Sequence, residues 1–145
     1  KESVRVSIKQ ERRQKPIVVL GLDVQRTDVY REFIYALPKN LRPRGVASSG
    51  ALALALVATG RIDAIIQSPQ MPWDWCAGYP MILEAGGVFK CFHLENGCIV
   101  PVTEPSAADY DTTKQVLGFV AGHPKIVEEI FEILWRTIGA TSQKS

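Results

Sequence analysis

The chain contains 145 residues, of which 46% are apolar and 22% are charged. A chain of this size and composition forms one domain with a substantial core, so the composition excludes a disordered protein. The net charge of +2 is almost balanced. The basic residues form two small groups without interleaved aromatic side chains, which favours solvated loops over a nucleic-acid surface. These groups are Lys9, Arg12, Arg13 and Lys15, and then Lys39, Arg42 and Arg44.

Cysteine usage and hydropathy bear on the compartment. The three cysteines, Cys76, Cys91 and Cys98, include no Cys-x-x-Cys pair. This spacing argues against a disulfide framework and against a structural zinc site, and it favours a reducing, intracellular compartment, with the cytoplasm first. No apolar run approaches the roughly 18 residues that a membrane span needs, so no membrane partner is expected. Because the sequence starts at Lys1 rather than Met, an organelle is kept as the alternative compartment.

In the first half of the chain, apolar runs and turn residues alternate over short distances. Alternation of apolar and polar residues predicts a half-buried strand, and a continuous apolar run predicts a strand buried on both faces. Capping residues before a periodic apolar face predict a helix. On these grounds we predict strands at residues 4–8, 17–22, 44–47 and 62–66, and helices at residues 27–37 and 51–59. Pro38 ends the first helix and Gly60 closes the second.

The second half continues this alternation. We predict a loop at residues 68–71 and a helix at 73–85, which Pro80 should kink or delay. A hairpin at 88–100 turns at Glu95-Asn96-Gly97, a strand follows at 115–120, and Pro124 opens a final amphipathic helix. Strands that alternate with helices of about ten residues predict an α/β fold, a layered mixed sheet flanked by helices, in a single domain over residues 1–145.

Small residues open the predicted helix at residues 51–59. Ser48, Ser49 and Gly50 leave backbone N–H groups accessible there, and the helix dipole attracts a phosphate to this end. Ordinary N-capping by Ser48 or Ser49 explains the same residues, and taken alone it is the favoured interpretation.

A second candidate is Asp74, which lies between Trp73 and Trp75 just after Pro72. One carboxylate fixed by bulky aromatic residues suits a metal ligand or a general base, although a helix cap explains it equally well. The tryptophans are expected to pack at the core and rim of this helix start. In open α/β sheets, ligands bind beyond the carboxyl ends of the strands, where helix N-termini meet. The two helix starts together suit a magnesium-bridged phosphate site, although one aspartate cannot hold the metal alone.

Other polar candidates have simpler explanations. Asp63 leads into a strand and is expected to be a structural hydrogen-bonding residue. His93 and His123 are far apart in sequence and are expected on the solvated surface. Cys76 follows Asp74 by two positions, but the sequence places no histidine beside it, so a small core residue is favoured over a nucleophile.

Taken together, four segments resemble the inositol monophosphatase family in their order and spacing. The family pattern is a Gly-Ser-Ala-Ala-like turn, an alanine-rich helix ending in Val-Ala-x-Gly-x-x-Asp, then Trp-Asp-x-Ala-Ala-Gly and a closing Glu-Ala-Gly-Gly. The resemblance is specific over residues 44–88 and looser elsewhere. The four segments are Ser48-Ser49-Gly50-Ala51, Val57-Ala58-Thr59-Gly60-Arg61-Ile62-Asp63-Ala64, Trp73-Asp74-Trp75-Cys76-Ala77-Gly78 and Glu84-Ala85-Gly86-Gly87.

The resemblance implies the C-terminal half of the sugar-phosphatase fold and a magnesium-dependent, lithium-sensitive phosphomonoesterase. It implies that Asp74 is a catalytic metal ligand, and that Ser48, Ser49 and Gly50 form a turn whose backbone approaches the substrate phosphate or hydroxyls. Gln67 stands where inositol-specific members carry a glutamate that contacts the sugar ring, so inositol itself is not implied. The motifs do not separate inositol phosphates from adenosine bisphosphates as the substrate class.

Departures from the family pattern limit what this chain is expected to do. The family's other metal ligands come from a Glu-Glu motif and an Asp-Pro-x-Asp-Gly-Thr motif in an N-terminal half. The second motif does not occur in these residues, and their Glu-Glu pair, Glu128-Glu129, lies in the predicted final helix rather than in such a half. Pro80 also replaces a helix-compatible residue. We therefore expect Mg²⁺ to have most of its ligands outside this chain, and the chain alone to be inactive on phosphate esters.

Two functional hypotheses follow. The first is part of a Mg²⁺-dependent phosphomonoesterase that acts on a small phosphorylated polyol or nucleotide. The second is a catalytically inactive module of the same family, with a structural or interaction role in a larger assembly and an open sheet face that a partner covers. The expected partners are a small phosphorylated substrate and either the missing N-terminal half or a partner chain. A homodimer is a further option.

Overall fold

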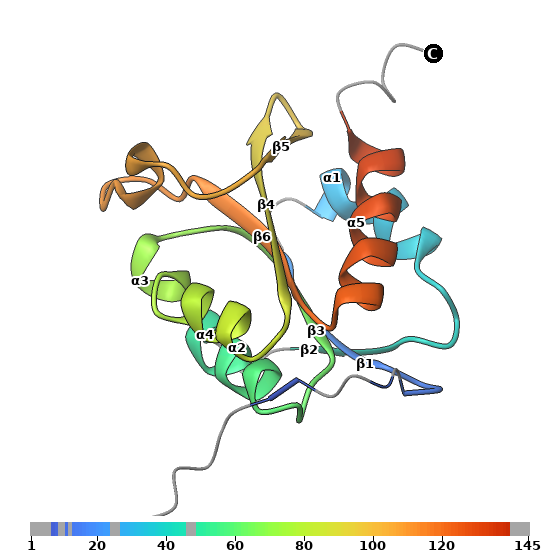
Figure 1. Ribbon diagram of the computed structural model, residues 1–145. Coiled ribbons are helices and arrows are strands. Elements are labelled where there is room, and N and C mark those ends of the chain that lie inside the picture. The colour runs from blue at the N-terminus through green and yellow to red at the C-terminus, as the bar shows by residue number, and fades with distance from the viewer. Residues whose placement is uncertain (1–6, 9–10, 12, 24–26, 46–48, 140–145) are drawn as a thin grey trace, which may run out of the picture.

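The computed structural model describes residues 7–8, 11, 13–23, 27–45 and 49–139. In this part of the chain, one six-stranded mixed sheet lies between helices that cover both of its faces, which gives three layers (Figure 1). The predicted α/β class with a layered mixed sheet is confirmed. The elements in chain order are β1 (Ile17–Gly21), α1 (Thr27–Ala36), β2 (Arg42–Gly45), α2 (Gly50–Ala58), β3 (Ala64–Gln70), α3 (Pro72–Trp75), α4 (Gly78–Glu84), β4 (Val88–Glu95), β5 (Cys98–Val102), the short 3₁₀ helix η2 (Ala107–Tyr110), β6 (Leu117–Gly122) and α5 (Pro124–Ile138).

The strand order of the sheet is β2-β1-β3-β6-β4-β5. The first three strands are parallel, whereas β6 runs antiparallel to both β3 and β4, and β4 and β5 form a hairpin. The carboxyl ends of β1, β2 and β3 therefore share one edge of the sheet, where α/β proteins bind their ligands. The chain that leads into β6 reaches the same edge, because Leu117 pairs with Gln70 at the end of β3.

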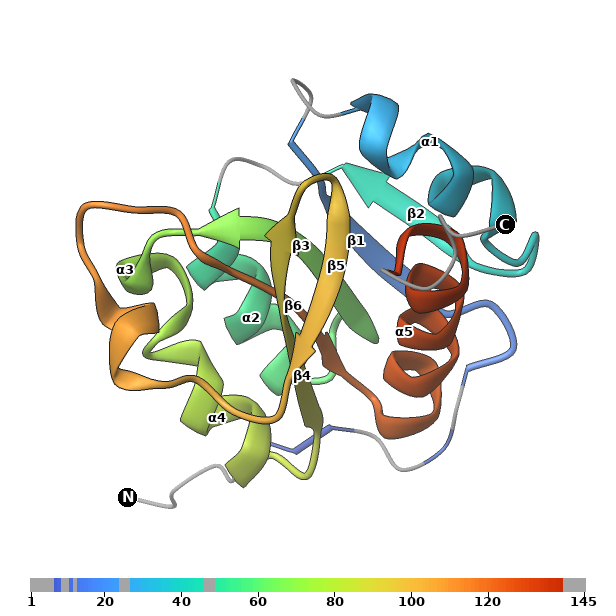
Figure 2. The same ribbon diagram turned by 90° about the horizontal axis from the view of Figure 1, so that it is seen from above.

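Two apolar cores lie on opposite faces of the sheet, one under each layer of helices. Figure 2 shows these helices on either side of the sheet. Helices α2, α3 and α4 cover one face, where Leu54 and Phe119 are buried. Helices α1 and α5 cover the other face, where Tyr30 is buried. Successive side chains of a strand point to opposite faces, so Ile65 enters the first core and Ile66 enters the second. Burial on both faces explains why β3 and β6 begin as continuous apolar runs.

The local signals that the sequence analysis used are confirmed at three turns. Asn96 and Gly97 have φ angles of 51° and 78°, as a two-residue type I′ hairpin turn requires. Gly60 follows α2, and its N–H donates to the carbonyl of Val57. Pro124 is the first residue of α5, where its missing N–H has no intrahelical partner to lose.

The predicted loop at residues 68–71 was wrong, because β3 continues to Gln70. The pairing of β3 with β6 shifts between Gln67 and Gln70 and then resumes with Leu117. An irregularity of this kind breaks the apolar pattern without ending the strand. The apolar pattern therefore placed the end of the strand too early.

Other boundaries differ by smaller amounts. The predicted helix at residues 73–85 is divided into α3 and α4, and Pro80 lies in the first turn of α4, where backbone N–H groups have no intrahelical acceptor. Of the strand predicted at residues 4–8, only Ser7 and Ile8 are described, and they lie outside any strand. Of the strand predicted at 44–47, residues 46–47 lie outside the described residues, and β2 covers Arg42–Gly45.

The cysteines agree with the predicted lack of a disulfide framework. All three are free thiols, and Cys91 and Cys98 are buried. Burial, with the nearby negative charge of Asp109, raises the pKa of Cys91 to about 12, so this thiol is protonated at neutral pH. Among the described residues, no helix combines the length and the apolar character that crossing a bilayer would require.

Candidate active site

The N-terminus of α2 is the first component of the site. Ser49 is the N-cap residue, and its Oγ accepts a hydrogen bond of 3.2 Å from the Leu52 N–H. Capping by Ser49 is therefore confirmed, whereas Ser48 lies outside the described residues. The N–H groups of Gly50 and Ala51 have no acceptor within the helix, because they belong to its first turn. They leave a partial positive charge at this end of α2.

Asp74 and Gln67 meet the start of α2 at Gly50. A Cβ atom at position 50 would lie 3.5 Å from the Asp74 carbonyl oxygen, 3.8 Å from the Asp74 Cβ and 3.8 Å from the Gln67 Oε1. Gln67 is buried in β3, with 8% of its surface exposed. Three residues that the sequence analysis selected separately, Gly50, Gln67 and Asp74, therefore lie together at the carboxyl edge of the parallel strands.

Gly21 is a component that the sequence analysis missed. It is the last residue of β1 and pairs with Gln67 of β3. A Cβ atom at position 21 would overlap the Gln67 side-chain amide, so the amide can lie across the end of β1 only because residue 21 is glycine. A glycine that ends a buried strand was the available signal in the sequence.

The two tryptophans beside Asp74 in the sequence differ in burial. Trp75 is completely buried and Trp73 is 59% exposed, as predicted for core and rim packing, and Cys76 packs against the same core. The half-buried Asp74 lies between the two tryptophans. The N-cap residue of α3 is Met71, which makes no side-chain capping bond. The helix-cap explanation of Asp74 was therefore wrong.

A magnesium site needs more ligands than this edge offers. Mg²⁺ in proteins is commonly held by one or two carboxylates, water and substrate phosphate, so Asp74 fits the role of one ligand. Among the described residues, no group of three or more His, Cys, Asp or Glu side chains could hold a metal ion. These residues alone do not fit a complete metal site.

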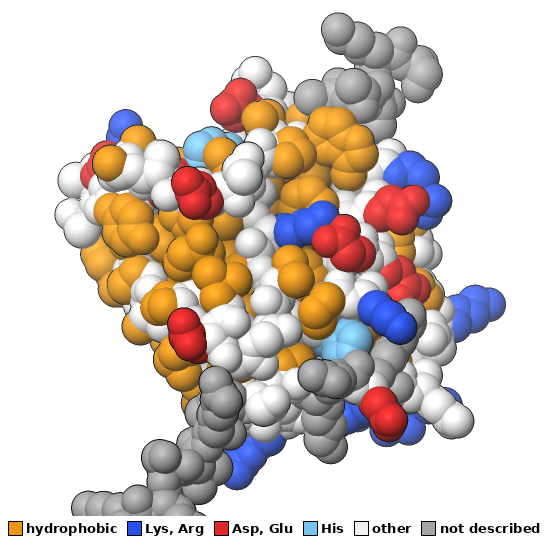
Figure 3. Space-filling model, in the orientation of Figure 1, with side chains coloured by type: hydrophobic (Ala, Val, Ile, Leu, Met, Phe, Trp, Pro, Cys, Tyr) orange, Lys and Arg blue, Asp and Glu red, His pale blue; other side chains and the backbone are white. Residues whose placement is uncertain are grey.

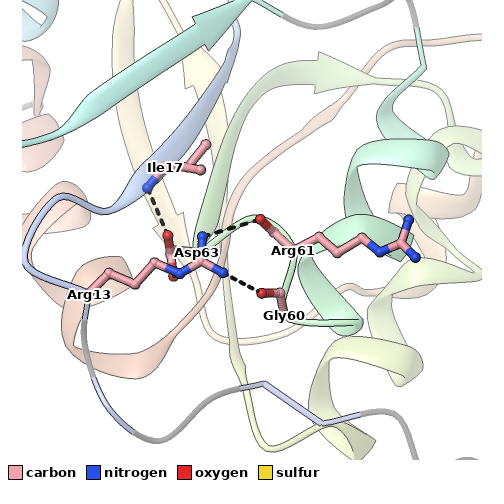
Figure 4. Close-up of polar contacts among 5 residues, drawn as sticks. All are labelled: Arg13, Ile17, Gly60, Arg61 and Asp63. Carbon is pink, nitrogen blue, oxygen red and sulfur yellow. Dashed lines mark hydrogen bonds and ion pairs between the residues drawn. The ribbon is translucent and has the colours of Figure 1, made fainter.

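Asp63 is a structural residue, as expected (Figure 4). Its Oδ2 accepts a hydrogen bond of 2.7 Å from the Ile17 N–H, and its Oδ1 lies 3.5 Å from the Arg13 Nε. Arg13 also donates to the carbonyls of Gly60 and Arg61. This cluster joins the start of β1 to the turn between α2 and β3, at the edge of the sheet opposite the candidate site.

The two histidines were wrongly predicted as solvated surface residues. His123 is buried between β6 and α5, and its backbone N–H donates to the Asp63 carbonyl at 2.8 Å. The His93 Nε2 lies 2.6 Å from the Oδ1 of Asp109, whose side chain is fully buried. Burial raises the pKa of Asp109, but hydrogen bonds from Ser106 and His93 outweigh it, so the pKa lies below its usual value. Both histidines hold the fold together, away from the site.

The fold is that of an α/β protein in which the start of α2, Gln67 and Asp74 lie together at the carboxyl edge of the parallel strands. Residues 2–136 match the model of the inositol monophosphatase family, and the chain belongs to that family. It is 40% identical over 93 residues to the inositol-1-monophosphatase of Bacillus subtilis, covering 63% of this chain and 30% of that protein. It is 28% identical over 138 residues to an inositol monophosphatase of Dictyostelium discoideum, covering 92% and 45% respectively.

Solved structures share the fold. Mycobacterium tuberculosis SuhB aligns with a TM-score of 0.63 at 23% identity, covering 92% of this chain and 46% of that one. An inositol monophosphatase from Anabaena aligns with a TM-score of 0.62 at 21% identity, covering 94% and 52% respectively. The chain spans less than half the length of the two curated relatives named above.

Proposed function

We propose that this chain forms one side of the active site of a Mg²⁺-dependent phosphomonoesterase that acts on a small phosphorylated polyol or nucleotide. The proposal depends on one observation: the carbonyl oxygen and Cβ of Asp74 and the side-chain amide of Gln67 lie beside Gly50, at the start of α2. Membership of the inositol monophosphatase family supports a phosphatase.

In this proposal the substrate phosphate binds at the N-terminus of α2. The helix has nine residues, which is long enough for a dipole that favours an anion at this end. Ser49 already accepts the hydrogen bond of Leu52, so the N–H groups of Gly50 and Ala51 are the donors that would bind phosphate oxygens. Because Gly50 has no side chain, phosphate oxygens can approach this backbone closely.

Asp74 would be one carboxylate ligand of the magnesium ion. When bound, Mg²⁺ supplies positive charge that stabilises the phosphoryl oxygens. The remaining carboxylates would come from residues outside this chain, which agrees with the length comparison. We therefore expect the chain alone not to hydrolyse phosphate esters.

The Gln67 side chain would contact the substrate beyond its phosphate. An amide is neutral and both donates and accepts hydrogen bonds, so it can bind a hydroxyl group without the charge of a glutamate. Gln67 supports a contact to hydroxyls, and it does not select between a polyol and a nucleotide.

The exposed apolar side chains of the α2–α4 layer support a packing partner. Both faces of the sheet are covered by helices, so the expected open sheet face is not found among the described residues. Helix α2 is apolar on all sides, which is typical of a helix covered on all sides. Leu52, Trp73, Met81 and Leu83 are exposed, and apolar side chains gather over the α3–α4 side of the molecule (Figure 3). We propose that an N-terminal half like that of longer family members, or a partner chain, packs here.

A catalytically inactive module is the second candidate function. The lack of a carboxylate cluster among the described residues and the neutral Gln67 favour it. The same apolar layer would then serve assembly alone. The three free cysteines support a reducing compartment for either function.

Replacement of Asp74 tests the proposed function. In the full-length native chain, Asp74→Asn should lower Mg²⁺-dependent phosphate release by at least about 100-fold, because loss of outer-shell contacts alone costs 10–100-fold in many metal sites. Asp28→Asn is the matched control, since Asp28 is an exposed carboxylate on α1. Equal activity of wild type and Asp74→Asn would overturn the proposal. A full-length chain without phosphatase activity on either substrate class would favour the inactive module.

A further inference from the structure

A long connection joins β5 to β6. It covers residues 103–116 and includes η2, whereas most connections in compact domains have about 4–6 residues. Connections of this length are uncommon and usually have a function. Figure 1 and Figure 2 both show this orange segment beside α3, the short helix that includes Asp74.

The carboxylate of Asp109 fixes η2 to the sheet. Its Oδ2 accepts hydrogen bonds of 2.7 Å from the Ser106 N–H and 2.9 Å from the Ser106 Oγ. Its Oδ1 lies 2.6 Å from the Nε2 of His93 on β4. The Asp109 side chain is fully buried, and hydrogen bonds to an ionised group are stronger when they are shielded from water. Helix η2 is therefore held firmly against β4.

The residue after this anchor, Tyr110, connects η2 to α3. Its ring packs on the indole ring of Trp75, with the ring centroids 5.0 Å apart and the planes tilted by 55°. Tilted aromatic pairs at this separation attract each other. Tyr110 is 49% exposed and Trp75 is completely buried, so Tyr110 covers the tryptophan at the margin of the core.

Helix α3 depends on contacts of this kind for its position. It has four residues, far fewer than the roughly 12–15 that an isolated helix needs. The Cys76 N–H closes its turn on the Pro72 carbonyl at 2.8 Å. The buried Nε1 of Trp75 has no hydrogen-bond acceptor among the described residues, so packing holds this side chain. Because Asp74 directly precedes Trp75, a shift of the tryptophan is transmitted to Asp74 through the backbone.

We propose that η2 supports α3 and thereby sets the position of Asp74, so that Tyr110 and Asp109 are positioning residues. Tyr110 acts through Trp75, and Asp109 acts by fixing η2 to β4. This inference rests on the proposed function for the role of Asp74. Groups that perform chemistry must be held within about 0.5 Å of their productive geometry, and a helix of one turn needs support from its surroundings to reach that precision.

Kinetics of the full-length native chain provide the first test, with an inositol phosphate or an adenosine bisphosphate, whichever the wild type hydrolyses. In Tyr110→Ala, the half-saturating concentration of Mg²⁺ should rise by about 10-fold, as for loss of an outer-shell contact, and the KM for the substrate should not change. Tyr110→Phe should restore the wild-type value, because the ring contact needs no hydroxyl group. Tyr35→Ala is the matched control, since Tyr35 is exposed on α1.

Amide hydrogen exchange of the same variants provides a test that needs no activity. Tyr110→Ala should speed exchange of the Cys76 N–H, which closes α3, by about 3- to 10-fold, the factor expected for loss of one aromatic pair. The Gly87 N–H closes α4 on the Ile82 carbonyl at 2.9 Å and should exchange at the wild-type rate. Asp109→Asn should give the same pattern, because η2 then loses its charged anchor.

The outcomes separate this inference from the proposed function. In an active chain, an unchanged Mg²⁺ requirement of Tyr110→Ala would overturn the inference. Faster exchange at both Cys76 and Gly87 would also overturn it, because the variant would then destabilise the whole layer rather than α3. A wild-type chain without Mg²⁺-dependent phosphate release would contradict the proposed function. Exchange at Cys76 and Gly87 would then decide by itself whether η2 supports α3.

Discussion

Replacement of Gly78 by alanine should separate α4 from α2 and destabilise the protein. A Cβ atom at position 78 would lie 2.8 Å from the Leu54 Cβ and would overlap the end of the same side chain. Leu54 is completely buried in the core between these helices and the sheet. Its Cβ moves only with the backbone of α2, so rotation of the leucine side chain cannot relieve the whole contact.

The expected loss follows from two opposing effects. Carbon atoms prefer a separation of about 3.5–4.0 Å, so the two helices must move apart by roughly 1 Å. Overpacking of this kind costs about 1–3 kcal/mol. Alanine favours a helix over glycine by at most about 1 kcal/mol, and less at the first position of α4. The free energy of unfolding should fall by about 1–2 kcal/mol.

Urea unfolding of the full-length native chain, followed by tryptophan fluorescence, measures this change. Gly45→Ala is the control, because among the described residues, its chain neighbours aside, no atom lies within 4 Å of a Cβ atom placed there. In a Leu54→Ala background, Gly78→Ala should cost less than it does alone, since most of the clashing side chain is gone. A Gly78→Ala protein as stable as wild type would refute the close packing of α2 and α4.

Two further predictions concern buried carboxylates. Asp63→Ala should lower the free energy of unfolding by about 2 kcal/mol, because the Ile17 N–H loses a charged acceptor. Arg13→Met should cost less than about 1 kcal/mol, since Arg13 is partly exposed; an equal loss in urea titrations would contradict this ranking. The pKa of Asp109 is lower in the folded state than in the unfolded state. The ionised carboxylate therefore stabilises the fold fully above the unfolded pKa, about 3.9. This stabilisation is lost as the pH falls through the folded pKa. Asp109→Asn should remove this acid-dependent part of the unfolding free energy, and an unchanged profile below about pH 4 would refute it.

Local patterns predicted most elements of the fold. Asn96-Gly97 specified its hairpin turn because few residue pairs adopt two positive φ angles, and Pro124 marked the first residue of α5 because of its missing N–H. The pattern failed at the end of β3, where Gln70 stays in the strand only because Leu117 of β6 pairs with it. A partner 47 residues away in sequence leaves no local signal.

Only some components of the candidate site could be predicted from the sequence. The sequence by itself determined that Ser49-Gly50 opens one helix, that Asp74 lies between two tryptophans along the chain, and that the chain resembles the inositol monophosphatase family. Only the tertiary structure decided that Gln67 lies across Gly21 to meet Gly50, and that Asp23, Ser68 and Lys114 share a pocket. Motifs specify backbone conformation over a few residues, whereas a pocket depends on how strands separated by 40 or more residues align in the sheet, and that alignment is set by the packing of the whole core.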